Sequence, residues 1–217
     1  MKKLLFLLLT ACTLLMYAQE KKTFYDDIQH FKKLNTHLPP ARTAILFLGS
    51  SSFTMWQDVN DYFPGKTIIN RGFGGSSLAD LNYYSRELLS PYRPKQIVIY
   101  CGENDFASHP ALKPKEVLKR FKTFYKTIRT YDPNIDVSYI STKMSPSREA
   151  LWPKFEETNL LIKKFLSARK NTHYIDITKG MQDAEGKVRT DLFLEDQLHL
   201  KPEGYAIWAK IIDPYLQ

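Results

Sequence analysis

Serine, aspartate and histidine side chains can act together in nucleophilic chemistry, and all three occur here in turn-like settings. A buried-strand pattern, 44–48, runs through Gly49 into Ser50, Ser51 and Ser52. The glycine permits a tight strand-to-helix turn that exposes a hydroxyl, and a helix N-terminus favours developing negative charge. Serine is also a common helix N-cap. Taken alone, the block therefore leaves a nucleophile and a cap as alternatives.

Asp196 and His199 form a second block near the end of the chain. Pro202 fits the first turn of a helix, which places both residues in the loop that enters the last helix. A carboxylate three residues before a histidine in a turn can reach the imidazole. It would then fix the tautomer and stabilise the imidazolium formed when histidine accepts a proton. A solvated loop histidine is the alternative.

Two further blocks supply hydrogen-bond donors. In the segment 70–76, Gly72, Gly74 and Gly75 allow backbone amides to approach a bound group closely. The spacing does not fit a dinucleotide fingerprint, because the third glycine position is serine. In the segment 102–105, Asn104 offers an amide donor that never titrates and suits an oxyanion. A plain turn is the alternative for this last block.

The elements that must position these blocks alternate along the chain. Short apolar runs predict strands at 44–48, 67–70, 96–100, 135–141 and 173–177. Amphipathic patterns predict helices at 77–89, 115–130, 148–170 and 201–212, and an earlier helix within 19–40. This alternation predicts an α/β fold, a three-layer α/β/α sandwich with a five-stranded parallel sheet.

The polar blocks share one position relative to the predicted strands. They collect just past the carboxyl ends of predicted strands. In open parallel sheets, ligands bind at that edge. We therefore expect a functional site at that edge.

Composition excludes several classes of protein. The chain has 217 residues, 43% of them apolar, and a formal net charge of +8. This is ordinary globular composition, unlike that of disordered, collagen-like or multi-spanning membrane proteins. The lysines fall mainly in helical stretches, as on solvated helix faces, and no nucleic-acid-binding signature accompanies them. We expect no nucleic-acid partner, whereas an anionic polysaccharide or lipid surface stays open.

The remaining histidines and the two cysteines have no spacing that suits a metal site, so we expect neither a metal nor another cofactor.

The first residues have the pattern of an export signal. A basic start precedes the apolar run 4–16, which is short for a membrane span, and we expect cleavage after Ala18. Residues 19–217 would then form a single exported domain, periplasmic or secreted, without stable membrane insertion. The alternative is a lipoprotein, because the segment 9–12 resembles a lipobox that would leave Cys12 lipidated.

Together the four blocks resemble those of the SGNH hydrolases, also called GDSL esterases. The residues that name the family correspond to Ser51, Gly75, Asn104 and His199, with Asp196 three residues before the histidine. The resemblance spans about residues 42–216 and implies the flavodoxin-like fold of the family.

The resemblance also implies roles for these residues. Ser51 would be the nucleophile, His199 the general base and acid, and Asp196 the residue that orients the histidine. The backbone amides of Ser51 and Gly75 and the side-chain amide of Asn104 would form the oxyanion hole. Where the family often has Gly-Asp-Ser-Leu, this chain has Ser50 and Ser52 around Ser51, so only the family register selects the nucleophile.

The sequence says less about the substrate. The chain has no long apolar insertion that could form a lid over the site. This favours an ester with a short acyl group, acetyl above all, and we expect that group to be carried on a carbohydrate hydroxyl. Trp56 and Trp152 are candidate platforms for a sugar ring, with core packing as the alternative, and Lys143 and Arg148 are candidate contacts for an anionic substituent. Two other functions stay open. One is a lysophospholipase or a lipid esterase like the platelet-activating-factor acetylhydrolases, and the other is an inactive glycan-binding protein.

Overall fold

The structure, a computed structural model, describes residues 22–217. Its helices are α2 Tyr25–His37, α3 Ser51–Thr54, α4 Leu78–Tyr83, α5 Ser85–Leu89, α6 Glu103–Ser108, α7 Pro114–Tyr131, α8 Trp152–Ser167 and α9 Pro202–Ile212. Its strands are β1 Ile45–Gly49, β2 Ile68–Gly72, β3 Gln96–Tyr100, β4 Asp136–Ile140 and β5 Thr172–Ile175. The short 3-10 turns are η1 Val59–Tyr62, η2 Pro146–Leu151, η3 Lys179–Met181, η4 Thr190–Leu192 and η5 Asp213–Tyr215.

The predicted signal segment and Cys12 lie outside the described residues. Within residues 22–217, no helix has both the length and the apolar character needed to cross a membrane.

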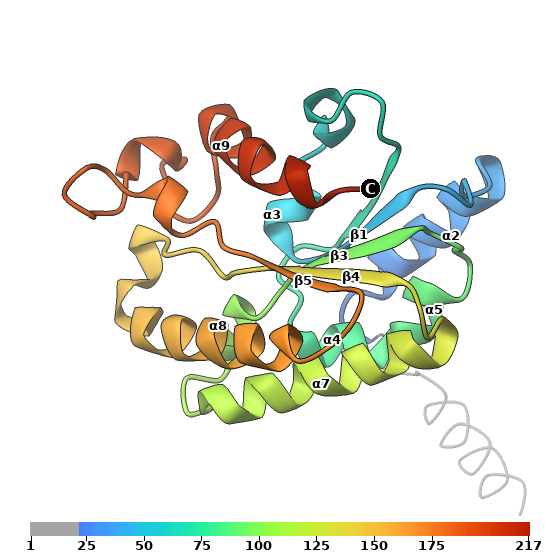
Figure 1. Ribbon diagram of the computed structural model, residues 1–217, viewed down its shortest axis with the longest axis horizontal. Coiled ribbons are helices and arrows are strands. Elements are labelled where there is room, and N and C mark those ends of the chain that lie inside the picture. The colour runs from blue at the N-terminus through green and yellow to red at the C-terminus, as the bar shows by residue number, and fades with distance from the viewer. Residues whose placement is uncertain (1–21) are drawn as a thin grey trace, which may run out of the picture.

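The five strands form one parallel sheet in the order β2-β1-β3-β4-β5 (Figure 1). The chain adds β2 on one side of β1 and then β3, β4 and β5 on the other, so the order in which strands are added reverses between β1 and β3. Such a reversal leaves the carboxyl ends of the central strands open to a ligand. The α/β architecture predicted from the alternating pattern is confirmed.

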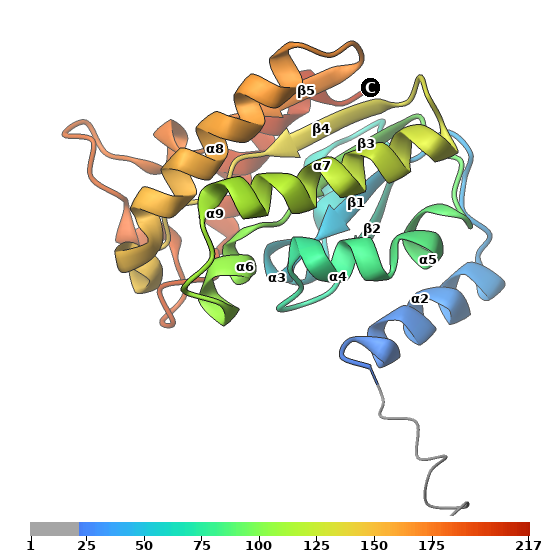
Figure 2. The ribbon, with the colours of Figure 1, turned by 90° about the horizontal axis from the view of Figure 1, so that it is seen from below.

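Both faces of the sheet are covered, which explains why its central strands are apolar throughout. Leu46 and Leu48 of β1 face a core that α2, α4, α5, α7 and α8 cover (Figure 2). Ile45 and Phe47 face the other core, which α3, α9 and several 3-10 turns cover. Alternate residues of one strand thus stabilise two separate layers.

Two predicted helices are divided in the structure. The pattern 77–89 becomes α4 and α5, which meet at Tyr84, a buried residue whose hydroxyl donates to the Thr23 carbonyl at 2.7 Å. The pattern 148–170 begins as the 3-10 turn η2, in which Arg148 has a non-helical backbone (φ −118°, ψ 24°). In both places tertiary contacts outweigh local helix propensity.

Gly49 lets the end of β1 lie directly against β3, and Gly72 lets the short helix α3 lie directly against the end of β2. A Cβ on Gly49 would lie 2.0 Å from the Tyr100 carbonyl oxygen, and one on Gly72 would lie 2.6 Å from the Thr54 nitrogen. Both neighbours are backbone atoms that cannot rotate away. The turn that carries Ser51 therefore requires glycine at position 49, just before it in the chain, and at position 72, at the end of the neighbouring strand β2.

This close approach gives a test of the fold. Gly49→Ala should lower the free energy of unfolding by about 3 kcal/mol, the upper end of the usual cost of overpacking. The matched control is Gly74→Ala, whose new Cβ would meet nothing closer than 3.9 Å, with an expected change within about 0.5 kcal/mol. Urea unfolding of both variants measures the difference, and equal midpoints would contradict the packing described.

Candidate active site

Ser51 stands at the first position of α3, directly beyond β1. The Ser50 N–H donates to the Tyr100 carbonyl at 3.1 Å, and the Phe73 N–H donates to the Gly49 carbonyl at 2.9 Å. These bonds hold the turn against the neighbouring strands. The Ser51 side chain remains partly exposed at the carboxyl edge of the sheet.

Of the three adjacent serines, Ser51 is the one whose hydroxyl meets the imidazole. Its Oγ lies 3.0 Å from His199 Nε2. Ser52 is buried, its hydroxyl accepts from Lys143 Nζ at 3.2 Å, and its carbonyl accepts from the Tyr205 hydroxyl at 2.8 Å. The position of Ser51 beside the imidazole agrees with the family register, and its role as the nucleophile stays a prediction.

Asp196 uses its two carboxylate oxygens for different purposes. Oδ1 accepts the backbone N–H groups of Leu198 and His199 at 2.9 and 3.0 Å, which closes a tight turn. Oδ2 lies 2.5 Å from His199 Nδ1. The turn thus presents the second oxygen to the imidazole, and the Nδ1 proton leaves Nε2 free to accept from Ser51.

The hydrogen bonds of this turn favour the ionised carboxylate. Partial desolvation would raise the pKa of Asp196, but the His199 backbone N–H, the His199 ring and the Leu198 N–H together lower it to about 2. Asp196 therefore keeps its negative charge at every pH at which the protein would operate.

The same turn is tied to the segment beyond β4. Gln197 has a left-handed backbone (φ 52°), and its carbonyl accepts both the Ser147 N–H at 3.1 Å and the Ser147 hydroxyl at 3.0 Å. A left-handed non-glycine residue is strained by about 1–2 kcal/mol. These two bonds help to hold it, and they connect the Asp196–His199 loop to η2.

The three groups that the resemblance assigns to an oxyanion hole belong to the segments that follow β1, β2 and β3. The Ser51 N–H begins α3 and so has no acceptor within that helix. Gly75 is exposed and has a left-handed backbone (φ 85°), which glycine tolerates without strain. Asn104 follows β3 and is the second residue of α6.

Asp105, the residue after Asn104, anchors α6. It is fully buried, and its carboxylate accepts from the Leu78 N–H at 2.8 Å and from Arg120 Nη1 at 2.7 Å. The sequence interpretation of 102–105 as a turn did not identify this role. Asp105 ties α6 to the start of α4 and to α7, and so fixes the place of Asn104.

The amide of Asn104 is held at both ends. Its Nδ2 donates to the Ser76 carbonyl at 3.0 Å, and its Oδ1 accepts from Arg148 Nη2 at 2.8 Å. Asn104 itself is only 7% exposed.

A cluster of four buried polar residues and one partly exposed arginine lies beneath this edge, and we call it the charge network: Ser52, Tyr100, Glu103, Lys143 and Arg148. Lys143 Nζ bonds to both carboxylate oxygens of Glu103, at 3.3 and 3.2 Å, and to the hydroxyls of Ser52 and Tyr100, each at 3.2 Å. Tyr100 also donates to Glu103, and Arg148 Nη1 lies 3.3 Å from its Oε2.

Burial and pairing act in opposite directions on these groups. Desolvation would raise the pKa of Glu103, but the Lys143 and Arg148 charges lower it below its ordinary value. Desolvation lowers the pKa of Lys143, although Glu103 opposes that shift. One carboxylate thus faces two cationic side chains, and one of these, Arg148, also contacts Asn104.

The structure contradicts two predicted substrate contacts. Trp56 has no exposed surface, because it stacks on Tyr205 at 4.8 Å between ring centroids and packs against Trp208. Lys143 is 1% exposed, and its ammonium is taken up by Glu103. Both predictions are wrong for the same reason, since each side chain turns inward from the active edge.

The other two predicted contacts lie nearer the surface. Arg148 is partly exposed, but its guanidinium is bonded to Glu103 and Asn104. Trp152 is half-buried, and its indole N–H donates to the Ser145 carbonyl at 3.0 Å. A substrate contact at either residue stays a prediction.

A hollow of about 360 Å³ borders the segments that carry Ser51 and His199. Met55 lies on its wall and donates its N–H to the Ser51 carbonyl, and Leu200 follows His199 directly. Gln57, Asp58 and Tyr62 add polar groups to the same wall.

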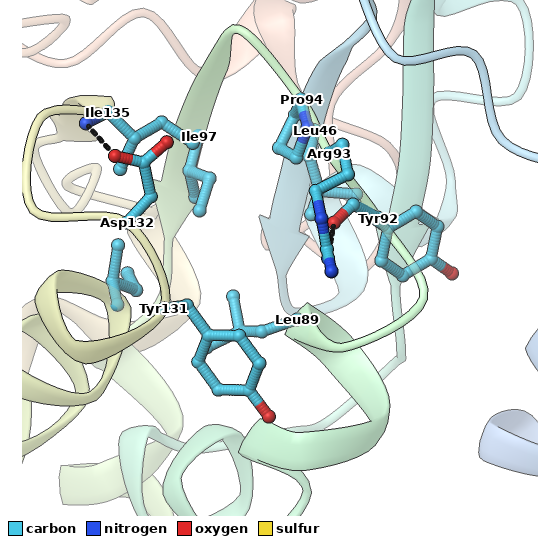
Figure 3. Close-up of a pocket in the computed structure, with 10 residues that line it drawn as sticks. Leu46, Leu89, Tyr92, Arg93, Pro94, Ile97, Tyr131, Asp132 and Ile135 are labelled. Atoms are coloured by element: carbon cyan, nitrogen blue, oxygen red, sulfur yellow. Dashed lines mark hydrogen bonds between the residues drawn. The ribbon is translucent and has the colours of Figure 1, made fainter.

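A smaller hollow, of about 140 Å³, lies at the opposite edge of the sheet, at the amino ends of the strands (Figure 3). Its charged groups bond to nearby backbone: Asp132 accepts from the Ile135 N–H, and Arg93 donates to the Tyr92 carbonyl. The chemistry-bearing residues are therefore at the other edge. Among residues 22–217, no cluster of His, Cys, Asp and Glu side chains could hold a metal ion.

Comparison with solved structures shows the same architecture in other proteins. A Streptococcus pneumonia protein named for platelet activating factor superposes with a TM-score of 0.78 at 20% identity, covering 96% of this chain and 99% of that one. A GDSL-like lipase from Bacteroides thetaiotaomicron gives 0.74 at 20% identity, covering 87% and 96%. An acetyl xylan esterase from Geobacillus stearothermophilus gives 0.60 at 15% identity, covering 79% and 95%. At these identities the likeness shows the fold.

The sequence comparisons are more specific. No curated protein matches the chain. Residues 47–207, however, match the GDSL-like Lipase/Acylhydrolase family, and this range includes each of the four blocks. The chain belongs to the GDSL-like lipase/acylhydrolase family, the SGNH hydrolases.

Proposed function

We propose that this protein is an exported serine esterase that removes short acyl groups, acetyl above all, from the hydroxyls of a carbohydrate. The observation that carries the proposal is the unbroken line of contacts from Ser51 Oγ to His199 Nε2 and from His199 Nδ1 to Asp196 Oδ2. An ester hydrolase of the triad type needs this arrangement.

Acylation would begin with attack of Ser51 Oγ on the ester carbonyl, while His199 Nε2 takes the hydroxyl proton. The ionised Asp196 holds the Nδ1 proton and stabilises the imidazolium. His199 then returns the proton to the alcohol oxygen as the carbon–oxygen bond breaks. The sugar hydroxyl leaves, and the acyl group remains on Ser51.

The negative oxygen of the tetrahedral intermediate would lie among the Ser51 N–H, the Gly75 N–H and Asn104 Nδ2. Loss of one such donor costs about 2.7–4 kcal/mol of transition-state stabilisation in a measured analogue. Of the cationic side chains in the charge network, Arg148 contacts the Asn104 side chain directly, at 2.8 Å from Nη2 to Oδ1.

Deacylation would repeat the sequence with water in place of the alcohol. His199 takes a proton from the water, the resulting hydroxide attacks the acyl carbon, and the proton returns to Ser51 Oγ. The carboxylic acid leaves and the free enzyme is restored.

The surroundings of the triad support a small acyl group and a polar alcohol. Gly74, whose own Cβ would lie 3.9 Å from Ser51 Cβ, is exposed. The hollow that borders this segment has Gln57, Asp58 and Tyr62 among its lining residues, and these could bond to sugar hydroxyls. The acetyl xylan esterase with the same fold supports this substrate class. A lipid ester is the second candidate, and the similarity to the Streptococcus protein named for platelet activating factor favours it.

Export is part of the proposal and rests on the residues 1–18 pattern, with lipidation at Cys12 as the alternative. It agrees with a polymeric substrate that cannot enter a cell.

The nucleophile assignment is tested with p-nitrophenyl acetate and residues 19–217. Ser51→Ala should lower turnover by about 10⁴–10⁶-fold, because the triad acts as a unit. Ser50→Ala is the matched control and should retain most of the activity, since the imidazole contacts Ser51. Activity that survives in Ser51→Ala but disappears in Ser50→Ala would contradict the assignment.

The ionisation of Asp196 gives a pH test. Because the pKa of Asp196 is lowered to about 2, its charge is present throughout the range from about pH 4 to 9 and is lost only as the pH falls through that value. Asp196→Asn should lower kcat by about 10⁴-fold, and no pH in that range should restore it. A full kcat profile over the same range measures this, and a variant within tenfold of the parent would contradict the role.

The substrate class is tested with p-nitrophenyl esters of increasing acyl length. The value of kcat/KM should be highest for acetate and fall by at least about tenfold by octanoate, because the proposed substrate carries a short acyl group and the site is expected to discriminate against a longer one. A rise toward octanoate would contradict the carbohydrate proposal and favour the lipid ester. Binding of acetylated glycan without turnover would indicate the inactive binding protein instead.

A further inference from the structure

The orientation of the Asn104 amide is set by two partners of opposite kind. Arg148 carries only donors, so the Asn104 atom that faces Nη2 at 2.8 Å must be the oxygen. The Ser76 carbonyl is only an acceptor, so the atom that faces it at 3.0 Å must be the nitrogen. Each contact excludes the flipped amide independently.

This orientation matters for an oxyanion. The bond to Ser76 uses one of the two Nδ2 hydrogens, and the second is left for the oxyanion that the proposed function places in front of Ser51. A flipped amide would present its carbonyl oxygen there instead. It would repel the developing negative charge.

Arg148 is itself held from below. Its Nη1 lies 3.3 Å from Glu103 Oε2, and Glu103 is 5% exposed and bonded to the buried Lys143. Lys143 Nζ also bonds to Ser52, the residue after the nucleophile. One buried network therefore connects α3, α6 and η2.

We propose that Arg148 is a positioning residue that holds the Asn104 amide with its nitrogen toward the oxyanion, with Glu103 and Lys143 as its buried anchor. This inference rests on the proposed esterase function and assigns Arg148 a role other than contact with an anionic substrate. Both Nη atoms are already bonded within the protein.

The experiment is a double-mutant cycle between Arg148 and Asn104, measured with p-nitrophenyl acetate. Asn104→Ala should lower kcat by about 10²–10³-fold, the usual loss for one oxyanion donor. Arg148→Met should lower kcat by about 10–100-fold with KM within about threefold of the parent. The double variant should fall only to the level of Asn104→Ala, because Arg148 acts through Asn104.

Two further variants test whether the loss of activity comes from the lost geometry of Arg148, from its lost charge, or from removing any arginine. Arg148→Lys keeps the positive charge but not the planar fork that reaches two acceptors, and kcat should fall about tenfold. Arg189→Met removes an exposed arginine that pairs with Asp191, and both kinetic constants should be unchanged.

Two results would overturn the inference. Multiplicative losses in the double variant would show that Arg148 acts independently of Asn104. A raised KM with unchanged kcat in Arg148→Met would show a substrate contact instead. If Arg148→Met fails to fold by circular dichroism, the same cycle is run with Arg148→Lys. An inactive parent protein would count against the proposed function, whereas an active parent with a multiplicative cycle counts only against the role of Arg148.

Discussion

The contact between Ser51 Oγ and His199 Nε2 joins positions that are 148 residues apart in the chain, and the arrangement of the site depends on it. A contact of this separation forms only when every intervening element has its place. The parallel sheet supplies that constraint, because each strand delivers its following turn to the same edge. Close packing of β1 against β3 at Gly49, and of α3 against the end of β2 at Gly72, sets the height of Ser51 at that edge.

The charge network lies beneath this contact. Burying its charges costs free energy, and the hydrogen bonds and ion pairs among its members offset that cost. Isolated buried ions are strongly disfavoured, and a buried pair is tolerated when its remaining hydrogen-bonding groups are satisfied. Here each Glu103 oxygen has more than one donor, and Lys143 has acceptors on three side chains. The network therefore acts as a rigid support rather than as a loose ion pair.

Sequence patterns predicted the architecture and the four blocks because local features carry them: apolar runs, glycine turns and the Asp196–His199 spacing. They failed where a side chain's direction depends on distant partners. Trp56 lies five residues after Ser51 but packs inward on Tyr205 of α9. Lys143 is buried because Glu103 meets it from the end of the neighbouring strand β3, 40 residues away. The sequence does contain a signal for this pair. Glu103 stands next to Asn104, and the oppositely charged Lys143 follows the next strand.

The central claim is that Ser51 alone among three adjacent serines is the nucleophile. It is tested most directly by treating the native protein with phenylmethanesulfonyl fluoride, which sulfonylates activated serines, and mapping the adduct by peptide mass spectrometry. The account predicts complete loss of esterase activity with one sulfonyl group, located on Ser51. An adduct on Ser50 or Ser52, or full activity with Ser51 labelled, would contradict it.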